Sequence, residues 1–291
     1  MRPAQPLTVL VTGATGQQGG AAAAALRARG HRVRALTRRP ESPAAQALKI
    51  AGAQLVTGSF DDRSALEHAL RGADAVFAVG TPIEAGVDGE AVQGMAMVDA
   101  AVASGSPHYV FSSVASADQA TGIPHFESKF RVEEHLRRSG LPFTILAPTY
   151  FMDNLLAPWN LDALRSGVFA QALPAGRMLQ QVAVADIGAF AAHVIDNRAR
   201  FINTRVDFAS DELTSEAMVD IASRVSGRSI RYQQVPLDAV RAYNSDLAVM
   251  YEWLDRVGYS ADIPAIRTMA PYVAWHRFED WAREQDWSVI R

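Results

Sequence analysis

The sequence predicts a doubly wound α/β fold, in which a parallel β-sheet has helices on both faces and a smaller α/β lobe follows. Short β-branched runs alternate with helix-like segments across residues 1–150, which indicates βαβ units and a parallel sheet. The first strand–helix junction also carries three closely spaced glycines. The alternation becomes irregular later, so we expect residues 151–291 to form the smaller lobe, with segments that pack back on the first.

Six strands are expected in the first part of the chain, at residues 7–12, 31–37, 53–58, 74–79, 108–114 and 142–148. Helices are expected between them at residues 17–29, 43–51, 62–71, 89–104 and 126–139. These segments are followed by glycines that can end a helix at positive φ, namely Gly30, Gly52, Gly72, Gly105 and Gly140. Right-handed crossovers between the strands would leave helices on both faces of the sheet.

The smaller lobe is expected to contain both helices and strands. Residues 151–169 look helical, with an interruption at Pro158, because proline lacks the amide hydrogen that a helix interior needs. The other segments are a strand and helix within 177–197, a Thr-capped helix over 214–227, a strand over 229–236 and a mostly helical, Trp- and Tyr-rich tail over 237–291.

Composition narrows the range of functions. The 28 basic and 31 acidic residues give a net charge of −3, so nothing favours direct nucleic-acid binding, which usually needs a basic excess. The chain has no cysteine, and His108, His135 and His193 lack carboxylates at metal-binding spacing, so we expect no metal. No apolar run reaches the roughly 18 residues of a membrane span, and no signal peptide is evident. We therefore expect a cytoplasmic protein that does not bind a membrane.

The glycine-rich junction is typical of a Rossmann dinucleotide site. Gly13 would allow the tight turn, Gly16 would let the backbone approach a pyrophosphate, and Gly19 would allow close helix–strand packing. Amide groups at the start of the following helix would bind the phosphates. The candidate residues are Gly13, Thr15, Gly16, Gln17, Gln18 and Gly19. The alternative is a glycine-rich turn that binds no ligand.

The residues after the second strand predict the choice of cofactor. An NAD-preferring protein usually has Asp or Glu here, for the ribose 2′-hydroxyl, whereas this chain has Thr37, Arg38 and Arg39. Guanidinium groups suit a 2′-phosphate. We therefore predict NADP(H) over NAD(H), with Arg38 as the main contact; the alternative is a pair of solvated arginines.

Phe60 and Asp61 follow the third strand, at the edge where a doubly wound sheet would receive the adenine. Asp61 could accept a hydrogen bond from the adenine amino group. Alternatively, Asp61 or Asp62 only caps the next helix.

The region after the fifth strand resembles a short-chain dehydrogenase with one change. Such enzymes have a serine here and then Tyr-x-x-x-Lys on the next helix, and this chain has Ser112, Ser113 and Lys129. The position four before Lys129 is His125 rather than tyrosine, one helical turn away on the same face. His125 and Lys129 are the candidate catalytic residues, since histidine can transfer protons near neutral pH. The alternative for His125 is a capping or packing role.

Four stretches together resemble the NmrA-like family of atypical short-chain dehydrogenases: "GATGQQG" at 13–19, "PHFESK" with "VEEHL" at 124–136, "YFMDNLL" at 150–156 and "VAVADIG" at 182–188. The resemblance spans nearly the whole chain and is looser near the C-terminus. It implies a Rossmann domain with NADP bound against a small lobe. It also implies that Lys129, Tyr150 and Phe151 lie near the nicotinamide, and that Gly80 and Thr81 pass close to the ribose or pyrophosphate.

The family resemblance leaves three functions open. The first is an NADPH-dependent reductase of a small apolar acceptor such as a quinone or enone, with an apolar pocket lined by residues such as Phe151, Met152 and Trp159. The second is a redox sensor that regulates a partner protein or transcription, and the third is a different catalyst on the same fold. A small-molecule acceptor or a protein is thus the expected partner, and a homodimer is compatible with either.

Overall fold

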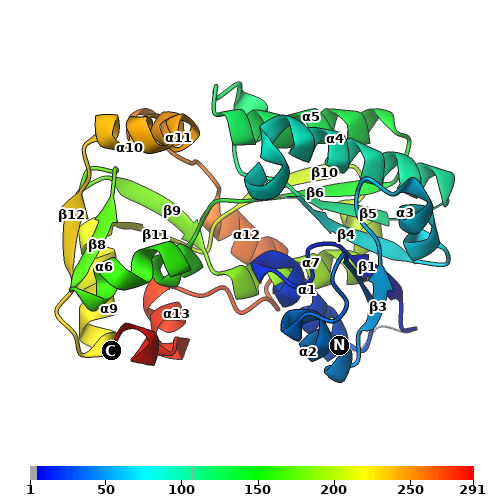
Figure 1. Cartoon of the computed structure of the whole chain (residues 1–291), viewed down its shortest axis with the longest axis horizontal. Coiled ribbons are helices and arrows are strands. Elements are labelled where there is room, and N and C mark those ends of the chain that lie inside the picture. The colour runs from blue at the N-terminus through cyan, green and yellow to red at the C-terminus, as the bar shows by residue number, and fades with distance from the viewer. Residues whose placement is uncertain (1–4, 81, 106–107) are drawn as a thin grey trace.

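The computed structural model describes residues 5–80, 82–105 and 108–291. Its larger sheet has seven strands, and every neighbouring pair is parallel. Across the sheet (Figure 1) they run β10 (Thr204–Phe208), β6 (Phe143–Pro148), β5 (His108–Ser112), β4 (Ala75–Val79), β1 (Thr8–Val11), β2 (Arg32–Thr37) and β3 (Gln54–Thr57). The chain starts in the middle and winds outward in both directions, which is the doubly wound order. The predicted fold class is confirmed.

Two sets of helices cover the faces of this sheet (Figure 1). On one face lie α1 (Gln17–Ala28), α2 (Pro43–Ile50) and α7 (Val184–Asp196), and on the other α3 (Arg63–Leu70), α4 (Pro82–Ala103) and α5 (Pro124–Arg138). Alternate residues of a strand point to opposite faces. In β1, Val9 and Val11 therefore join the cluster under α1 and α7, while Leu10 joins the cluster under α4 and α5.

The alanine-rich sequence of α1 allows unusually close packing against α7. A Cβ atom added to Gly188 would lie 2.4 Å from the carbonyl carbon of Ala21, closer than real side chains come. The two helix backbones therefore touch where both sequences have small residues, and α7, from the second half of the chain, becomes part of the first lobe.

The smaller lobe contains two short sheets and several helices. One sheet has the order β11 (Asp211–Thr214), β9 (Met178–Val182) and β7 (Tyr150–Phe151), and the other pairs β12 (Arg231–Gln234) with β8 (Val168–Gln171). Its helices are α6 (Leu161–Arg165), α9 (Ser215–Ser226), α10 (Leu237–Tyr243), α11 (Ser245–Arg256) and α13 (Phe278–Glu284). Two further helices, α8 (Arg198–Phe201) and α12 (Ile263–Met269), contribute Phe201 and Ile266 to the core under α1 and α7. Short 3₁₀ turns are η1 (Ala117–Gln119), η2 (Met152–Leu156), η3 (Pro158–Asn160) and η4 (Trp287–Ile290).

Most expected elements agree with the structure to within a few residues, and all five glycines expected at helix ends have positive φ. Two differences stand out. Residues 152–165 are helical and interrupted just before Pro158, as expected, but the turns on both sides of the break are 3₁₀ and only α6 is α-helical. The ends of the expected segment lie in strands, because Phe151 pairs with β9 and Val168 begins β8. The strand β10 was not expected, and it extends the first sheet beside β6.

Candidate functional site

The glycine turn lies at the carboxyl ends of β1 and β4. The Thr12 hydroxyl joins these strands, because it accepts from the Val79 amide at 2.9 Å and donates to the Val79 carbonyl at 3.0 Å. Gly13 has a φ of +58°, a region that glycine enters at little cost. A Cβ atom added to Gly19 would lie 2.3 Å from the Gly13 carbonyl oxygen. Gly19 thus lets α1 begin directly against the turn.

The start of α1 is open. No side chain caps the helix at Gly16, its first turn has no acidic residue, and Thr15, Gly16 and Gln17 are exposed. Such a terminus presents unpaired amides and a partial positive charge. Gln18 points instead toward β5, where its Oε1 accepts a 2.6 Å hydrogen bond from the Ser112 hydroxyl.

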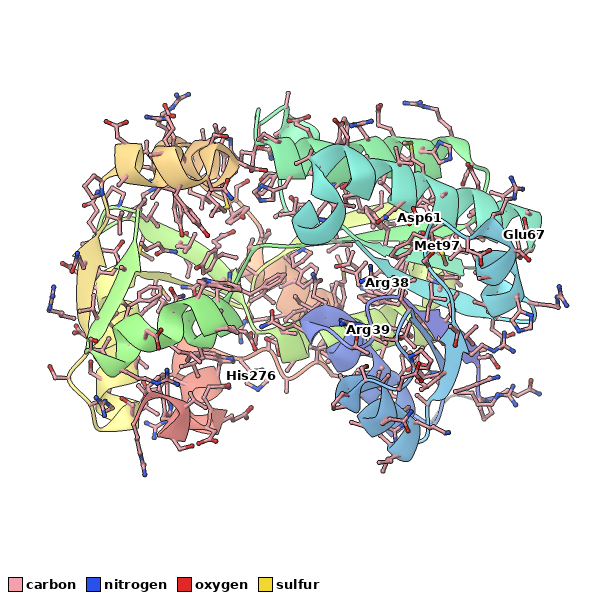
Figure 2. All side chains as sticks on the ribbon, in the orientation of Figure 1. Arg38, Arg39, Asp61, Glu67, Met97 and His276 are labelled. Atoms are coloured by element: carbon pink, nitrogen blue, oxygen red, sulfur yellow. The ribbon has the colours of Figure 1, made fainter. Side chains whose placement is uncertain are left out.

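Thr37, Arg38 and Arg39 lie at the carboxyl end of β2 in the same region. The Thr37 hydroxyl accepts from the Arg39 amide at 3.2 Å, which fixes the backbone as the chain leaves the strand. Both arginines are exposed, and Figure 2 shows Arg38 between Arg39 and Asp61 in that view. Because Thr37 pairs with Thr57, the chain leaves β2 beside the loop that follows β3.

The two aspartates of that loop have different contacts. Asp62 caps α3 by accepting from the Ala65 amide at 3.0 Å, while Asp61 accepts a long 3.4 Å hydrogen bond from the Gln93 side chain. Phe60 packs partly buried against the core under α4 and α5. The helix cap is thus Asp62, and Asp61 stays exposed.

Lys129 of α5 is paired with a buried carboxylate of α4. Glu90 is 3% exposed; its Oε1 pairs with Lys129 Nζ, and its Oε2 accepts a 2.5 Å hydrogen bond from Ser128. A Cβ atom added to Gly80 would lie 3.3 Å from Glu90 Oε1. The pair therefore lies directly under the loop that follows β4. Thr81, expected beside Gly80 at the cofactor, lies outside the described residues.

His125, one turn before Lys129, connects the two lobes. Its Nδ1 pairs with Asp246 of α11, and its ring meets the Phe126 ring edge-on, with 4.9 Å between centroids. Both the His125 and Asp246 side chains are partly buried. This contact ties the start of α5 to the start of α11.

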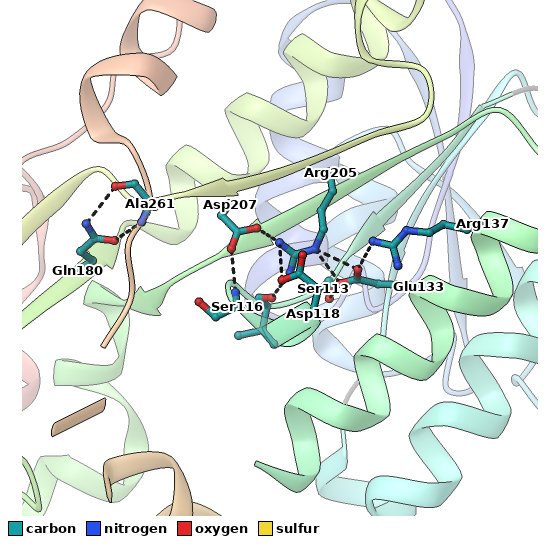
Figure 3. Close-up of polar contacts among 10 residues, drawn as sticks. Ser113, Ser116, Asp118, Glu133, Arg137, Gln180, Arg205, Asp207 and Ala261 are labelled. Carbon is teal, nitrogen blue, oxygen red and sulfur yellow. Dashed lines mark hydrogen bonds and ion pairs between the residues drawn. The ribbon is translucent and has the colours of Figure 1, made fainter. Parts of the chain in front are cut away.

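Ser113 belongs to a buried charge cluster (Figure 3). Its hydroxyl donates to Glu133, which is fully buried and accepts also from Arg137 at 2.8 Å and from Arg205 Nε at 3.0 Å. Arg205 of β10 pairs in turn with Asp207, which accepts from a backbone amide of the η1 region at 2.8 Å. The cluster connects β10 to α5, which points to a structural role for Ser113.

Tyr150 and Phe151 form β7, where they pair with Gln181 and Val182 of β9. Phe151 is partly buried against the core under α1 and α7. Burial raises the pKa of Tyr150 well above its usual value, and the neighbouring Asn154 and Gln171 side chains offset only part of the rise. The Tyr150 phenol therefore stays protonated across the physiological range.

Two residues expected to line an apolar pocket do not suit that role. Met152 is fully buried in the core of the smaller lobe, so it has no surface to offer a ligand. Trp159 is 70% exposed, because the 3₁₀ turn after Pro158 directs it to solvent. That part of the pocket prediction was wrong.

Two of the three histidines considered as metal ligands, His108 and His135, have other partners. His108 hydrogen bonds to Thr144 at 2.9 Å, and burial lowers its pKa to about 4; His135 pairs with Asp99 at 2.6 Å. Within the described ranges, no group of three or more His, Cys, Asp or Glu side chains is arranged to hold a metal ion. None of the helices in the part of the chain that the structure describes has both the length and the apolar character needed to span a bilayer.

The fold and the glycine turn define a Rossmann-like α/β protein. The NmrA-like family model matches residues 5–283, and the chain belongs to this family.

Three comparisons illustrate the range of its relatives. A (4-alkanoyl-5-oxo-2,5-dihydrofuran-3-yl)methyl phosphate reductase of Streptomyces griseus is 33% identical over 80% of this chain and 79% of its own. An NADPH-dependent quinone oxidoreductase of Escherichia coli, complexed with NADPH, is 24% identical with a TM-score of 0.77, covering 94% of this chain and 98% of that chain. The structure of NmrA, a negative transcriptional regulator, in complex with NADP is 21% identical with a TM-score of 0.79, and the match covers 98% of this chain and 99% of that chain.

Sequence reasoning missed two residues that contact the candidate catalytic side chains, Glu90 and Asp246. Helical spacing contains a signal for Glu90, because Met97 and Ala101 lie on the same stripe of α4 and all three are buried. An acidic residue on an apolar stripe indicates a buried ion pair. Asp246 offers no such signal, because it lies far along the chain in the first turn of α11.

Proposed function

We propose that this protein binds NADP(H) and reduces a small conjugated carbonyl compound of the quinone or enone class. The observation that carries the proposal is the open start of α1 with Arg38 and Arg39 at the neighbouring end of β2. Amides at a helix start favour a diphosphate, and guanidinium groups favour an additional phosphate. Together they fit the two anionic parts of NADP(H).

The other candidate residues would hold the rest of the cofactor. The Lys129 ammonium, fixed by Glu90, would donate to ribose hydroxyls, and Gly80 would pass close to the ribose or pyrophosphate. Tyr150 and Phe151 would border the nicotinamide. When bound, the cofactor supplies a hydride, and the protein orients it and keeps water from the reacting atoms.

The acceptor class follows from the missing tyrosine and from the relatives. His125 replaces the usual proton donor and is paired with Asp246, which makes alcohol–carbonyl chemistry a poor fit. Reduction of a conjugated carbonyl needs no strong protein acid, because solvent can protonate the product. The Streptomyces relative is named as a reductase of a (4-alkanoyl-5-oxo-2,5-dihydrofuran-3-yl)methyl phosphate, and the Escherichia coli relative as a quinone oxidoreductase.

The test is loss of NADPH absorbance with a panel of quinones and enones, compared with NADH at the same concentrations. Turnover that prefers NADPH supports the proposal. The proposal fails if calorimetry with NADPH gives neither heat nor a thermal shift.

The likeness to NmrA favours a second candidate, a sensor of the NADP(H) redox state that regulates a partner protein or transcription. A sensor needs different affinities for the two cofactor forms or a cofactor-dependent partner. Light scattering with NADPH and with NADP⁺ tests it. A change of mass with cofactor form and no turnover on the panel would favour the sensor over the reductase.

A further inference from the structure

A group of aromatic rings fills the layer between α5 and α11. Phe126 of α5 lies nearly parallel to Tyr259, at 6.4 Å between centroids, and edge-on to Trp253 of α11 at 6.1 Å. Trp253 and Tyr259 are 5.6 Å apart. Tyr150 and Tyr251 pack against the same cluster, so five rings from both lobes meet at the proposed nicotinamide end of the site.

A buried amide lies among the hydroxyl groups of this cluster. Gln171 of β8 is 3% exposed, and its Oε1 accepts a 3.2 Å hydrogen bond from Ser215. Its Nε2 has no hydrogen-bond acceptor within the described residues. The Gln171 side chain is nevertheless close enough to Tyr150 and Tyr251 to offset part of the rise in their pKa values. A buried donor without a partner costs free energy, so the position suits a ligand oxygen.

The two tyrosines also have donor capacity there. Burial raises the pKa of both Tyr150 and Tyr251, so both phenols remain neutral donors, while both side chains keep some exposed surface. The Gln171 amide is therefore near both phenols, and both tyrosines belong to the aromatic cluster. Neutral donors suit a carbonyl oxygen, and the rings suit a flat conjugated molecule.

We propose that Tyr150, Tyr251 and Gln171 bind a carbonyl oxygen of the acceptor. This inference rests on the proposed function, whose substrate site it specifies: a planar quinone or enone lies among the rings with one oxygen on these donors. During reduction a C–H bond forms to the incoming hydride, the π-electron pair moves onto the oxygen, and the three donors stabilise the resulting oxyanion. Solvent then supplies the proton, and NADPH leaves as NADP⁺.

The experiment separates recognition of the oxygen from recognition of shape. 1,4-Naphthoquinone and naphthalene have the same ring system, and the chain has no thiol to react with the quinone. Their affinities for the NADP⁺-loaded protein are measured by calorimetry for the wild type, Tyr251→Phe and Gln171→Met. Tyr243→Phe is the matched control, because Tyr243 is 86% exposed on α10.

We expect Tyr251→Phe and Gln171→Met each to reduce the affinity for 1,4-naphthoquinone about 3–10-fold, the range for one hydrogen bond. The affinities for naphthalene and for NADP⁺ should not change. Tyr243→Phe should match the wild type. Equal loss of quinone and naphthalene, or unchanged quinone affinity in Tyr251→Phe, overturns the inference. If Gln171→Met does not fold, the quinone affinity of Tyr251→Phe still tests the inference.

Turnover separates this inference from the proposed function. A wild type that oxidises NADPH with none of the acceptors contradicts the proposed function. Wild-type turnover with the same KM for quinone in Tyr251→Phe contradicts only the assignment of the oxygen site.

Discussion

The ammonium of Lys129 is paired with the carboxylate of Glu90, a buried group on the neighbouring helix α4. The same carboxylate accepts from Ser128 and lies beneath Gly80. The lysine that the family resemblance assigns to the cofactor is therefore held in place before any ligand binds. Such preorganisation reduces the entropy that binding must cost.

Glu90→Gln should destabilise the protein by about 2–4 kcal/mol, because it leaves a mostly buried ammonium without a counter-charge. Lys129→Met should cost a similar amount, and the double variant should cost less than the two single changes together. Urea unfolding of the four proteins measures this coupling. Strict additivity would contradict an energetically important pair.

Arg38→Ala should weaken the binding of NADP(H) by about 1.5–3 kcal/mol, the value of hydrogen bonds to a charged group. The binding of NAD(H), which lacks the 2′-phosphate, should be nearly unchanged. Calorimetric titration of both cofactors gives the comparison. Arg39→Ala is the matched control at the next position and should have the smaller effect. Equal losses for NADP(H) and NAD(H) in Arg38→Ala would argue against the 2′-phosphate assignment.

Gly16→Val should reduce the affinity for either cofactor at least about 100-fold, because several hydrogen bonds to a charged diphosphate are lost together. The protein should still fold, since Gly16 is exposed and has a φ of −99°, and the added Cβ, 3.3 Å from the Gly13 oxygen, requires only a small local shift. Circular dichroism and calorimetry check the two statements. Retained cofactor affinity would show that the turn is not the phosphate site.

Gly19→Ala should destabilise the fold, unlike Gly16→Val, because the added Cβ would lie 2.3 Å from the Gly13 carbonyl oxygen. The turn and α1 must then move apart, at a cost of about 1–3 kcal/mol. A lowered urea midpoint is the expected result. A midpoint equal to that of the wild type would mean that close packing at Gly19 is unimportant.

His276 makes stability depend on pH. Its Nδ1 is 2.6 Å from the buried Asp186, and hydrogen bonding to Asp186 raises the pKa of His276 to about 9, although burial opposes the rise. The native state therefore keeps a proton that the unfolded chain releases near pH 6.5. The stabilisation is complete below pH 6.5 and is lost as pH rises through about 9.

The size of this effect should be on the order of 1–2 kcal/mol after allowance for solvent screening. Urea midpoints from pH 6 to pH 10 should fall for the wild type and vary less for His276→Gln. Identical pH profiles for the two proteins would rule out His276 as the source. Figure 2 labels His276 on the C-terminal segment, which the bond to Asp186 fastens to α7.

Local patterns were sufficient to predict the doubly wound sheet. Alternating apolar runs and helix-ending glycines depend on backbone geometry and on short-range burial, so they can be read from neighbouring residues. The strand β10 escaped prediction because its pairing with β6 joins residues about sixty positions apart. The segment 151–169 is helical and interrupted at Pro158 as expected, but strand pairing of Phe151 with β9 and of Val168 and Phe169 with β12 shortens it at both ends, which local composition does not show.

The sequence by itself determined the fold class, the open glycine turn and the placement of two arginines after β2, since each can be read from patterns among neighbouring residues. The tertiary structure alone decided which side chains meet between elements far apart in the sequence. It paired Lys129 with Glu90 and His125 with Asp246, and it brought Gln171 close to the tyrosines of β7 and α11. The physical reason is that such contacts depend on how helices and strands pack, and packing brings together residues whose separation along the chain carries no periodic signal.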